Sequence, residues 1–458
     1  MSPPPNLSPL PGGHTRAGFL WARVDATAVL TLFTCAFVAM LGAVGADARW
    51  LAALGGLIVE AGGIPDGVPF AAAPSAGWPN VPALAELILH ALDAAFGDRG
   101  FVLAQVAAAG LAVTILCADI RKAFSGGRVP VLAIVVVGSF SALVAARVQL
   151  FSLVLFPLLL ALLRAEARRP SRRVWLLVPL VALWSNLHGA ALLGVAVAGA
   201  YLLLARARRE PLVALGVLGG SVLALGCTPA LLRTFDYYRG VFENEAARQG
   251  LGLWGRLDVR DPLDVILLVS AIALLVLAVK SRPPLWEAVA LGGVTLMTID
   301  SDRSGVWLLF LAALPACKGL GLPRARTVPR VAVVPLAAVV ALGLIRGPLP
   351  LQADSPLIAD ALARAGQTPI LAEAVPAEQL AVAGGKVWVT NPLDAFDRAD
   401  QRLYLDWLEG RPAGDAALAH APRVVVVTLG SDAQRRMATQ PSFREVRRGP
   451  YAVLYARV

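Results

Sequence analysis

Residues 47–65 read DARWLAALGGLIVEAGGIP and follow the first long apolar run of the chain. That run, residues 25–46, is long enough to cross a hydrocarbon core, which requires about 20 mostly apolar residues. Asp47 therefore stands where the span should meet water. A carboxylate there is either a solvated charge at a helix end or a reactive group at the mouth of a membrane cavity. Much of the functional interpretation depends on which it is.

The composition of the whole chain is that of a membrane protein. Its 458 residues are 57% hydrophobic and only 16% charged, with a mean hydropathy of +0.68. Soluble proteins carry about 25% charged residues. The four cysteines lie apart within apolar runs and have no CxxC spacing, so we interpret them as helix-packing residues. No zinc or haem motif is present, and the sequence predicts no metal-ligating residue.

The apolar runs predict an α-helical polytopic membrane protein with about eleven transmembrane helices. Several runs are short, and two pairs of them are separated by almost no loop, at Arg147 and at His188. The candidate spans are residues 25–46, 101–119, 129–146, 149–164, 174–187, 189–205, 211–227, 263–280, 284–300, 305–317 and 331–346.

The distribution of Lys and Arg predicts the orientation of these spans. If residues 1–24 form a cytoplasmic tail, the segments on that side hold 19 Lys and Arg in a little over sixty residues, against 9 in roughly ninety on the other side. Such an excess is typical of cytoplasmic loops. It accounts for the net charge of +10 without nucleic acid, because the Arg clusters lack interleaved aromatic residues for base stacking.

Residues 347–458 differ in composition and predict a small α/β domain. An odd number of spans places this domain outside the cytoplasm. Residues 386–392 (KVWVTNP) and 422–430 (PRVVVVTLG) are expected to form strands, and residues 444–458 a closing hairpin. Residues 397–410 (DRADQRLYLDWLEG) have the pattern of a helix.

Two long loops are expected on the same outer side. In the loop 47–100, residues 50–61 and 82–96 have the pattern of amphipathic helices at the membrane surface, with an irregular Gly- and Pro-rich stretch between them. The second loop, residues 228–262, is rich in aromatic and charged residues. Together the two loops are expected to form a lid and a substrate groove over a membrane cavity.

Several short motifs resemble those of bacterial GT-C glycosyltransferase-like proteins. In residues 47–65 the similarity rests on Asp47, Trp50, Gly55, Glu60, Gly62, Ile64 and Pro65. RVQLFS at 147–152 is similar to the Arg-Pro-Gln-Leu-Phe-Ser of that family, and LWSNLHGA at 183–190 to its Leu-Trp-x-Asn-Leu-His-Gly. CTPALL at 227–232 and SDRSGVW at 301–307 stand where the family has an Asn-Pro helix end and a short Arg-containing turn. The five motifs occur in the family's order over most of residues 25–320.

The resemblance implies a GT-C fold and an inverting transferase in the bacterial inner membrane, with a periplasmic C-terminal domain. Such an enzyme passes a sugar from a polyprenyl-phosphate carrier, itself a membrane lipid, to an acceptor at the outer face. It implies that an aspartate of the first outer loop, here Asp47, serves as general base or electrostatic anchor, and Asp66 is the candidate for a second catalytic acid. Arg147, His188 and Arg303 are expected at outer helix ends on the level of Asp47, where they would contact the carrier phosphate. A divalent metal is left open, and no particular protein partner is indicated.

The sequence departs from the family pattern at both places where a second acid is expected. Val68 stands where the family usually has Asp, and Asp66 lies two residues earlier. Val81, Pro82 and Ala83 replace a His-Glu-Trp, so that Glu86 is the next acid and a candidate substrate-binding residue. These departures leave open a non-catalytic membrane scaffold or assembly protein that retains the fold. A transporter is disfavoured, since no internal repeat is apparent and intramembrane charges are few.

Each candidate also has an ordinary structural interpretation. Asp66 precedes Gly67 and suits a turn, and Glu86 suits a solvated helix face. Asn186 is a candidate substrate contact, but it better suits the cap of a helix break, and His188 could bond backbone carbonyls. Arg147 could anchor a helix at the interface, and Arg303 could pair with a neighbouring Asp.

Overall fold

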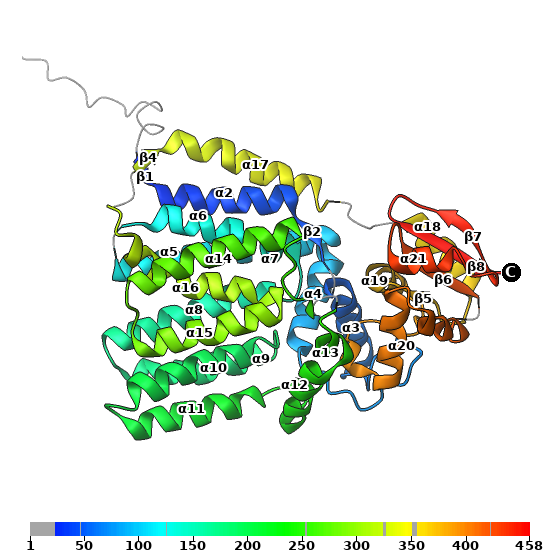
Figure 1. Ribbon diagram of the computed structural model, residues 1–458, viewed down its shortest axis with the longest axis horizontal. Coiled ribbons are helices and arrows are strands. Elements are labelled where there is room, and N and C mark those ends of the chain that lie inside the picture. Colours follow the sequence, from blue (N-terminus) through cyan, green and yellow to red (C-terminus); the bar gives the residue numbers. More distant parts are fainter. Residues whose placement is uncertain are drawn as a thin grey trace, which may run out of the picture.

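The computed structural model describes residues 23–45, 47–124, 126–251, 254–323, 327–349, 355–421 and 423–458. The predicted tail 1–24 lies outside these ranges except for its last two residues. Most of the chain is helical, and a small mixed sheet follows near the C-terminus. Figure 1 shows a bundle of roughly parallel helices, with the C-terminal sheet beyond one end of it.

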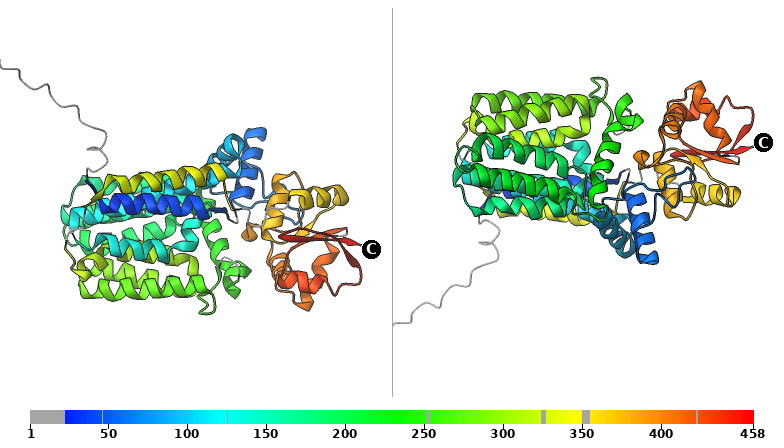
Figure 2. Two further views of the ribbon diagram at one scale, coloured as in Figure 1. Left: turned by 90° about the horizontal axis from the view of Figure 1, so that it is seen from above. Right: turned by 90° about the horizontal axis from the view of Figure 1, so that it is seen from below.

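Apolar helices form the bundle. Each of the predicted apolar runs contains one, and the helices pack side by side in all three views (Figures 1 and 2). The bundle consists of α2 (Ala26–Leu41), α5 (Asp98–Ala123), α6 (Arg128–Gly138), α7 (Phe140–Val144), α8 (Leu150–Arg168), η1 (Arg172–Leu176), α9 (Leu177–Ser185), α10 (Ala191–Tyr201), η2 (Leu202–Arg206), α11 (Pro211–Leu225), α14 (Pro262–Lys280), α15 (Leu285–Asp300), η5 (Asp302–Ser304), α16 (Gly305–Leu320), η6 (Arg330–Ala332) and α17 (Val333–Arg346).

Three of the described helices are long and apolar enough to cross a membrane on their own: α5, α8 and α14. Others, such as α2 and α11, are apolar but shorter, with 16 and 15 residues. In the predicted run 129–146 the helix is interrupted at Ser139. The run therefore forms two short helices, α6 and α7, instead of one long helix. The apolar helices and the fold indicate a multi-pass membrane protein.

Two pairs of very short strands tie the ends of the bundle. At one end β1 (Arg23–Asp25) pairs antiparallel with β4 (Thr327–Pro329). At the other end β2 (Ala43–Val44) pairs in parallel with β3 (Ala145–Ala146). The second pair is the more important for the site, because it joins the end of the first span to the segment before α8.

The predicted amphipathic helices of the first loop are confirmed as α3 (Ala48–Ala61) and α4 (Ala83–Phe96). The two helices pack together beside the bundle end, with η3 (Leu231–Arg233), α12 (Thr234–Glu243) and α13 (Glu245–Gln249) of the second loop nearby (Figure 1). Gly55 sets the approach of α3 to α4, since a Cβ there would lie 2.2 Å from the carbonyl oxygen of Glu86.

We expect Gly55→Ala to destabilise the protein by about 1 to 3 kcal/mol, because the added methyl group forces α3 away from α4. The measurement is the thermal unfolding midpoint of the purified protein in detergent. Gly292→Ala is the matched control, because a Cβ at Gly292 of α15 meets nothing within 4 Å. Equal midpoints for the two variants would contradict a close helix contact at Gly55.

The C-terminal segment contains a four-stranded sheet in the order β5-β6-β8-β7. Strand 422–430, helix 397–410 and the hairpin 444–458 are confirmed as β6, α20 and the pair β7–β8. The elements are α18 (Ser355–Ala365), β5 (Leu371–Ala372), α19 (Ala374–Val382), η7 (Leu393–Ala395), α20 (Arg398–Leu408), η8 (Pro412–Ala419), β6 (Val424–Thr428), α21 (Asp432–Met437), β7 (Phe443–Arg448) and β8 (Ala452–Arg457).

The prediction of a strand over 386–392 is wrong. Within that segment Val387 makes only isolated bridges, to Ile370 on one side and Ala71 on the other. The backbone N–H groups of Ala72 and Ala73 donate to the carbonyls of Val387 and Trp388, at 2.7 and 3.0 Å. The segment therefore connects the loop 47–100 to the C-terminal sheet, and the strand-like pattern of its own residues does not predict this contact.

Candidate active site

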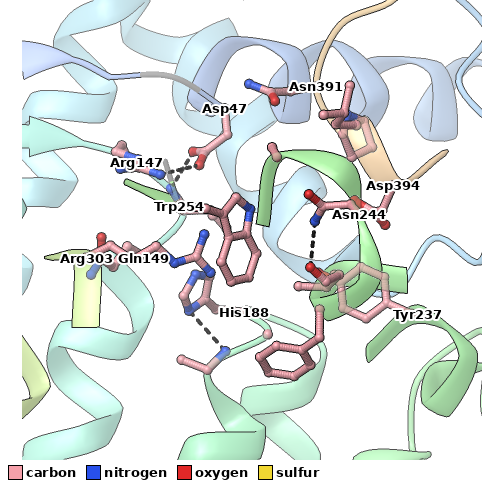
Figure 3. A pocket seen from close by; sticks show the side chains of 18 of the residues that line it. Asp47, Arg147, Gln149, His188, Tyr237, Asn244, Trp254, Arg303, Asn391 and Asp394 are labelled. Atoms are coloured by element: carbon pink, nitrogen blue, oxygen red, sulfur yellow. Dashed lines mark hydrogen bonds and ion pairs between the residues drawn. The ribbon is translucent and has the colours of Figure 1, made fainter. Parts of the chain in front are cut away.

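A cavity of about 730 Å³ lies where the bundle end, the loops 47–100 and 228–262 and the C-terminal segment meet. Figure 3 shows its polar side chains converging from segments far apart in sequence. Among the residues that line it are Asp47, Arg147, Gln149, His188, Tyr237, Asn244, Trp254, Arg303, Asn391 and Asp394.

The pair Asp47–Arg147 is placed by the β2–β3 strand pair. The register sets Val44 opposite Ala146, so each strand delivers one of the two residues shortly after it ends. The Asp47 carboxylate accepts from the Val148 N–H at 3.1 Å and lies 3.4 Å from the Arg147 guanidinium. Asp47 is therefore not a solvated helix-end charge, since its side chain is only 14% exposed and borders the cavity.

The backbone of Asp47 is held from the C-terminal segment. Its φ is 81°, a left-handed conformation that Asp and Asn tolerate better than most residues. Its N–H donates to Oε1 of Glu378 on α19 at 2.8 Å, and Glu378 is fully buried. The conformation of the candidate catalytic residue thus depends on a carboxyl group some 330 residues away in sequence.

Burial raises the pKa of both carboxyl groups. It raises the pKa of Asp47 above its ordinary value, while Arg147 and the Val148 N–H oppose the rise. Burial raises the pKa of Glu378 from 4.5 to about 8, against the opposing hydrogen bond from Asp47. The raised pKa of Asp47 makes its carboxylate a stronger base than a free one, which suits it to accept a proton.

We expect Glu378→Gln to remove part of the pH dependence of stability. Between pH 4.5 and 8 the folded protein keeps a proton on Glu378 that the unfolded chain has released, so stability falls as the pH rises through this window. The amide oxygen of Gln can still accept the Asp47 N–H. At pH 8 the variant should be more stable than the wild type by at least about 1.4 kcal/mol, the equivalent of one pKa unit. Near pH 4.5 the two should be equal.

Thermal unfolding in detergent at both pH values measures this difference. Glu409→Gln, at an exposed carboxylate on the same cavity, is the control and should leave the pH dependence unchanged. A Glu378→Gln variant with the wild-type pH dependence would contradict a protonated Glu378.

His188 lies in the short turn between α9 and α10 and is held in one orientation. The Trp184 indole N–H donates to the Ser152 hydroxyl at 2.7 Å, and this hydroxyl lies 2.7 Å from Nδ1 of His188. The Ala190 N–H also points at Nδ1, at 3.4 Å. Nδ1 therefore acts as acceptor, which leaves the proton of the neutral ring on Nε2. Burial, with Arg303 and Arg147 nearby, lowers the pKa of His188 to about 3, so the ring is a neutral donor at pH 7.

Arg303 is the cation of the cavity that has no acidic partner. Within the described ranges no carboxylate lies within 4 Å of its guanidinium, which stacks on the Trp254 ring at 3.9 Å. Burial and the like charge of Arg147 lower the pKa of Arg303 to about 10, so it stays charged at pH 7. Arg147 and Arg303 are neighbouring cations, and among the described residues only Arg147 is ion-paired with a carboxylate, which favours a bound anion.

The opposite wall of the cavity is aromatic and carries a second carboxylate. Asp394 accepts from the Trp78 indole N–H at 2.8 Å, and burial raises its pKa. Tyr237 packs edge to face against both Trp78 and Tyr238. Aromatic faces with a few placed polar groups are typical of small-molecule sites.

Three of the predicted site residues lie elsewhere. Asp66 is exposed and accepts from the Gly77 N–H at 2.7 Å, a contact across the loop. The turn expected at Asp-Gly is present in the backbone, since Gly67 has a left-handed φ of 67°. Glu86 is fully buried against Asn80, at 2.8 Å, rather than on a solvated face. Asn186 donates to the carbonyls of Ala182 and Cys227 and so joins two helix ends. None of the three lines the cavity.

Other cavity residues had no signal in the sequence. Trp254 and Tyr237 lie in the predicted second loop, where aromatic side chains suited a groove but no single one stood out. Asp394 lines the cavity, and Glu378 holds the Asp47 backbone without lining it. Both come from the C-terminal segment, in which no motif marks them. Over the described residues, no group of three or more His, Cys, Asp or Glu side chains is arranged to hold a metal ion.

Comparison with known proteins identifies the fold. No protein-family model matches the chain, and no curated protein matches it at a significant level. Among solved structures, ArnT from Cupriavidus metallidurans bound to undecaprenyl phosphate is similar to it over 94% of this chain and 97% of that chain, with a TM-score of 0.51 and 15% identity. The same protein in the apo state gives a TM-score of 0.46, and the mycobacterial arabinofuranosyltransferase AftD 0.45, with 41% of that chain covered. The expected GT-C fold is confirmed, in its ArnT-like form.

Proposed function

We propose that this protein is an integral-membrane glycosyltransferase that moves a sugar from a polyprenyl-phosphate carrier to an acceptor. The observation that carries the proposal is the convergence of Asp47, Arg147, His188 and Arg303 on one cavity. The ArnT structure of the same fold holds undecaprenyl phosphate, which is the kind of ligand that unpaired Arg303 and the His188 donor would suit.

The chemistry follows from the charges. The acceptor oxygen forms a bond to the anomeric carbon as the bond from that carbon to the carrier phosphate breaks, with inversion at the carbon. Asp47 accepts the proton of the acceptor hydroxyl, because a hydroxyl is a weak nucleophile. Arg303, Arg147 and Nε2–H of His188 stabilise the charge on the departing phosphate. Asp394 and the aromatic wall hold hydroxyl groups of the sugar or the acceptor.

We propose the membrane topology that the sequence predicts. Residues 25–346 form the transmembrane domain with about eleven spans, including the outer loops 47–100 and 228–262. Residues 1–24 are cytoplasmic, and residues 347–458 form the periplasmic domain. The site then lies at the outer face of the bacterial inner membrane, within reach of a carrier lipid in the bilayer.

Binding of undecaprenyl phosphate to the purified protein tests the carrier site. Arg303→Gln should weaken binding by at least about tenfold, because it removes a charged partner of the phosphate from a buried site. Arg256→Gln is the matched control, since Arg256 belongs to the same outer region but is 73% exposed and does not line the cavity. Equal affinities for the two variants, or no binding by the wild type, would contradict the proposal.

A second candidate is a scaffold that retains the fold without turnover. It is favoured by Asp66 and Glu86, because both lie outside the cavity and leave Asp47 without either acid predicted to assist it. A stoichiometric partner that copurifies through residues 347–458, with no release of polyprenyl phosphate from any sugar-charged carrier, would favour this candidate. Acceptor-dependent release would exclude it.

A further inference from the structure

A second cavity, of about 510 Å³, lies at the far end of the bundle from the first. It is bordered by the C-terminal ends of α8 and α16, by η2, and by the start of α15. The first cavity is lined by residues at or next to the opposite ends of α8, α10, α15 and α16. The two cavities are therefore separated by the length of these helices.

Positive charge dominates the second cavity. Arg164 and Arg206 are buried in its wall and neutralised, Arg164 by Glu287 at 2.6 Å and Asp119 at 3.0 Å, and Arg206 by Glu166 and Glu210. These pairs use both of the acids that line the cavity. Five further cations on the lining are exposed: Lys122, Arg168, Arg208, Arg209 and Lys318.

Four of these five cations have no acidic partner among the described residues. Arg168 lies 3.7 Å from Asp119, whereas Lys122, Arg208, Arg209 and Lys318 have no carboxylate within 4 Å in the part of the chain that the structure describes. Like charges gathered from the ends of α5, η2 and α16 repel each other, and a bound anion would relieve the repulsion.

Two buried donors on the same lining are also without acceptors. The indole Nε1 of Trp286 and Nε of Arg206 are buried and have no hydrogen-bond partner among the described residues. Trp286 packs edge to face on Tyr201 at 5.6 Å, which fixes the indole within the wall. The unmet groups are donors only, so the matching ligand is rich in acceptor atoms.

We propose that this second cavity binds a phosphate-bearing anion, either the headgroup of an anionic phospholipid or a soluble phosphate compound. Phosphate oxygens accept from N–H donors and pair with several cations at once. Basic pockets between membrane helices commonly hold lipid headgroups. Leu204, Leu285 and Leu314 add apolar surface beside the cations, which suits the glycerol and first acyl carbons of a lipid. The proposal does not depend on sugar transfer.

The test is binding to the full-length protein in detergent, measured by native mass spectrometry with two probes, cardiolipin and inorganic pyrophosphate. Arg208→Gln/Arg209→Gln should weaken binding of the probe by about tenfold or more, since two charges beside the phosphate are lost. Arg172→Gln/Arg173→Gln is the matched control. It removes two exposed arginines from η1, in the next loop at the same bundle end, which do not line the cavity.

The two probes separate the two sources of phosphate. Saturable cardiolipin binding that depends on Arg208 and Arg209 supports a lipid headgroup, and pyrophosphate binding with the same dependence supports a soluble compound. The proposal is overturned if neither probe binds the wild type, or if both double variants bind as the wild type does. Both variants remove the same charge from neighbouring loops, so a difference between them cannot arise from a general change in membrane orientation.

Discussion

Asp47→Asn should lower sugar transfer by about 10²- to 10⁴-fold, the range that a general base contributes. Asn has nearly the shape of Asp and tolerates the left-handed backbone at this position. Its side-chain oxygen can still accept the Val148 N–H, and its own N–H can still donate to Glu378. The variant therefore removes the basic oxygen and leaves the surroundings intact.

The measurement is acceptor-dependent release of polyprenyl phosphate from a sugar-charged carrier by the purified protein. Asp66→Asn serves as control, because this exposed turn residue lies outside the cavity, and it should keep wild-type activity. If Asp47→Asn retained full activity while the wild type turned over, Asp47 would have no role as the base.

Arg164→Met should be the most destabilising of the substitutions considered, by about 3 to 5 kcal/mol. Arg164 is 4% exposed and binds two carboxylates that are as deeply buried, Asp119 and Glu287. It also donates to the carbonyl of Leu311 at 2.8 Å. Removing the cation leaves two buried acids without compensation, which costs more than the loss of a surface pair.

The yield of folded protein and the thermal unfolding midpoint in detergent measure this effect. Arg168→Gln is the control, one helical turn away. The Arg168 side chain is 36% exposed, and its contact with the shared Asp119 is long, at 3.7 Å. It should shift the midpoint little. A midpoint for Arg164→Met close to that of Arg168→Gln would contradict a structural role for the buried triad.

Much of the fold follows from apolar periodicity and from turn residues. The apolar runs and the pattern of residues 397–410 and 444–458 predict helices and a hairpin that the structure contains, because these elements are stabilised locally and by one buried face. The segment 386–392 is different. Residues 387–390 are all buried, and Val387 bridges two neighbours, one of which, Ala71, lies in a loop some 300 residues earlier in the chain. No local sequence pattern predicts that partner.

For the site, residues at helix ends were predictable and residues placed by tertiary contacts were not. Asp47, Arg147, His188 and Arg303 each end or interrupt an apolar run, so the packing of the bundle brings them to one level. Glu86 also lies on a regular helix, but its side chain is fully buried against Asn80 and does not line the cavity. Glu378 contacts Asp47, and Asp394 contacts Trp78, in each case in a distant segment of the chain. No pattern in the sequence around Glu378 or Asp394 predicts these contacts.

A structure of the protein determined with undecaprenyl phosphate present tests the proposed carrier site most directly. The lipid phosphate should lie in the first cavity, within about 3 Å of the Arg303 guanidinium and of Nε2 of His188, as charge-assisted hydrogen bonds require. A first cavity without the lipid, at concentrations where the lipid binds elsewhere on the protein, would contradict the carrier site and with it the proposed transfer.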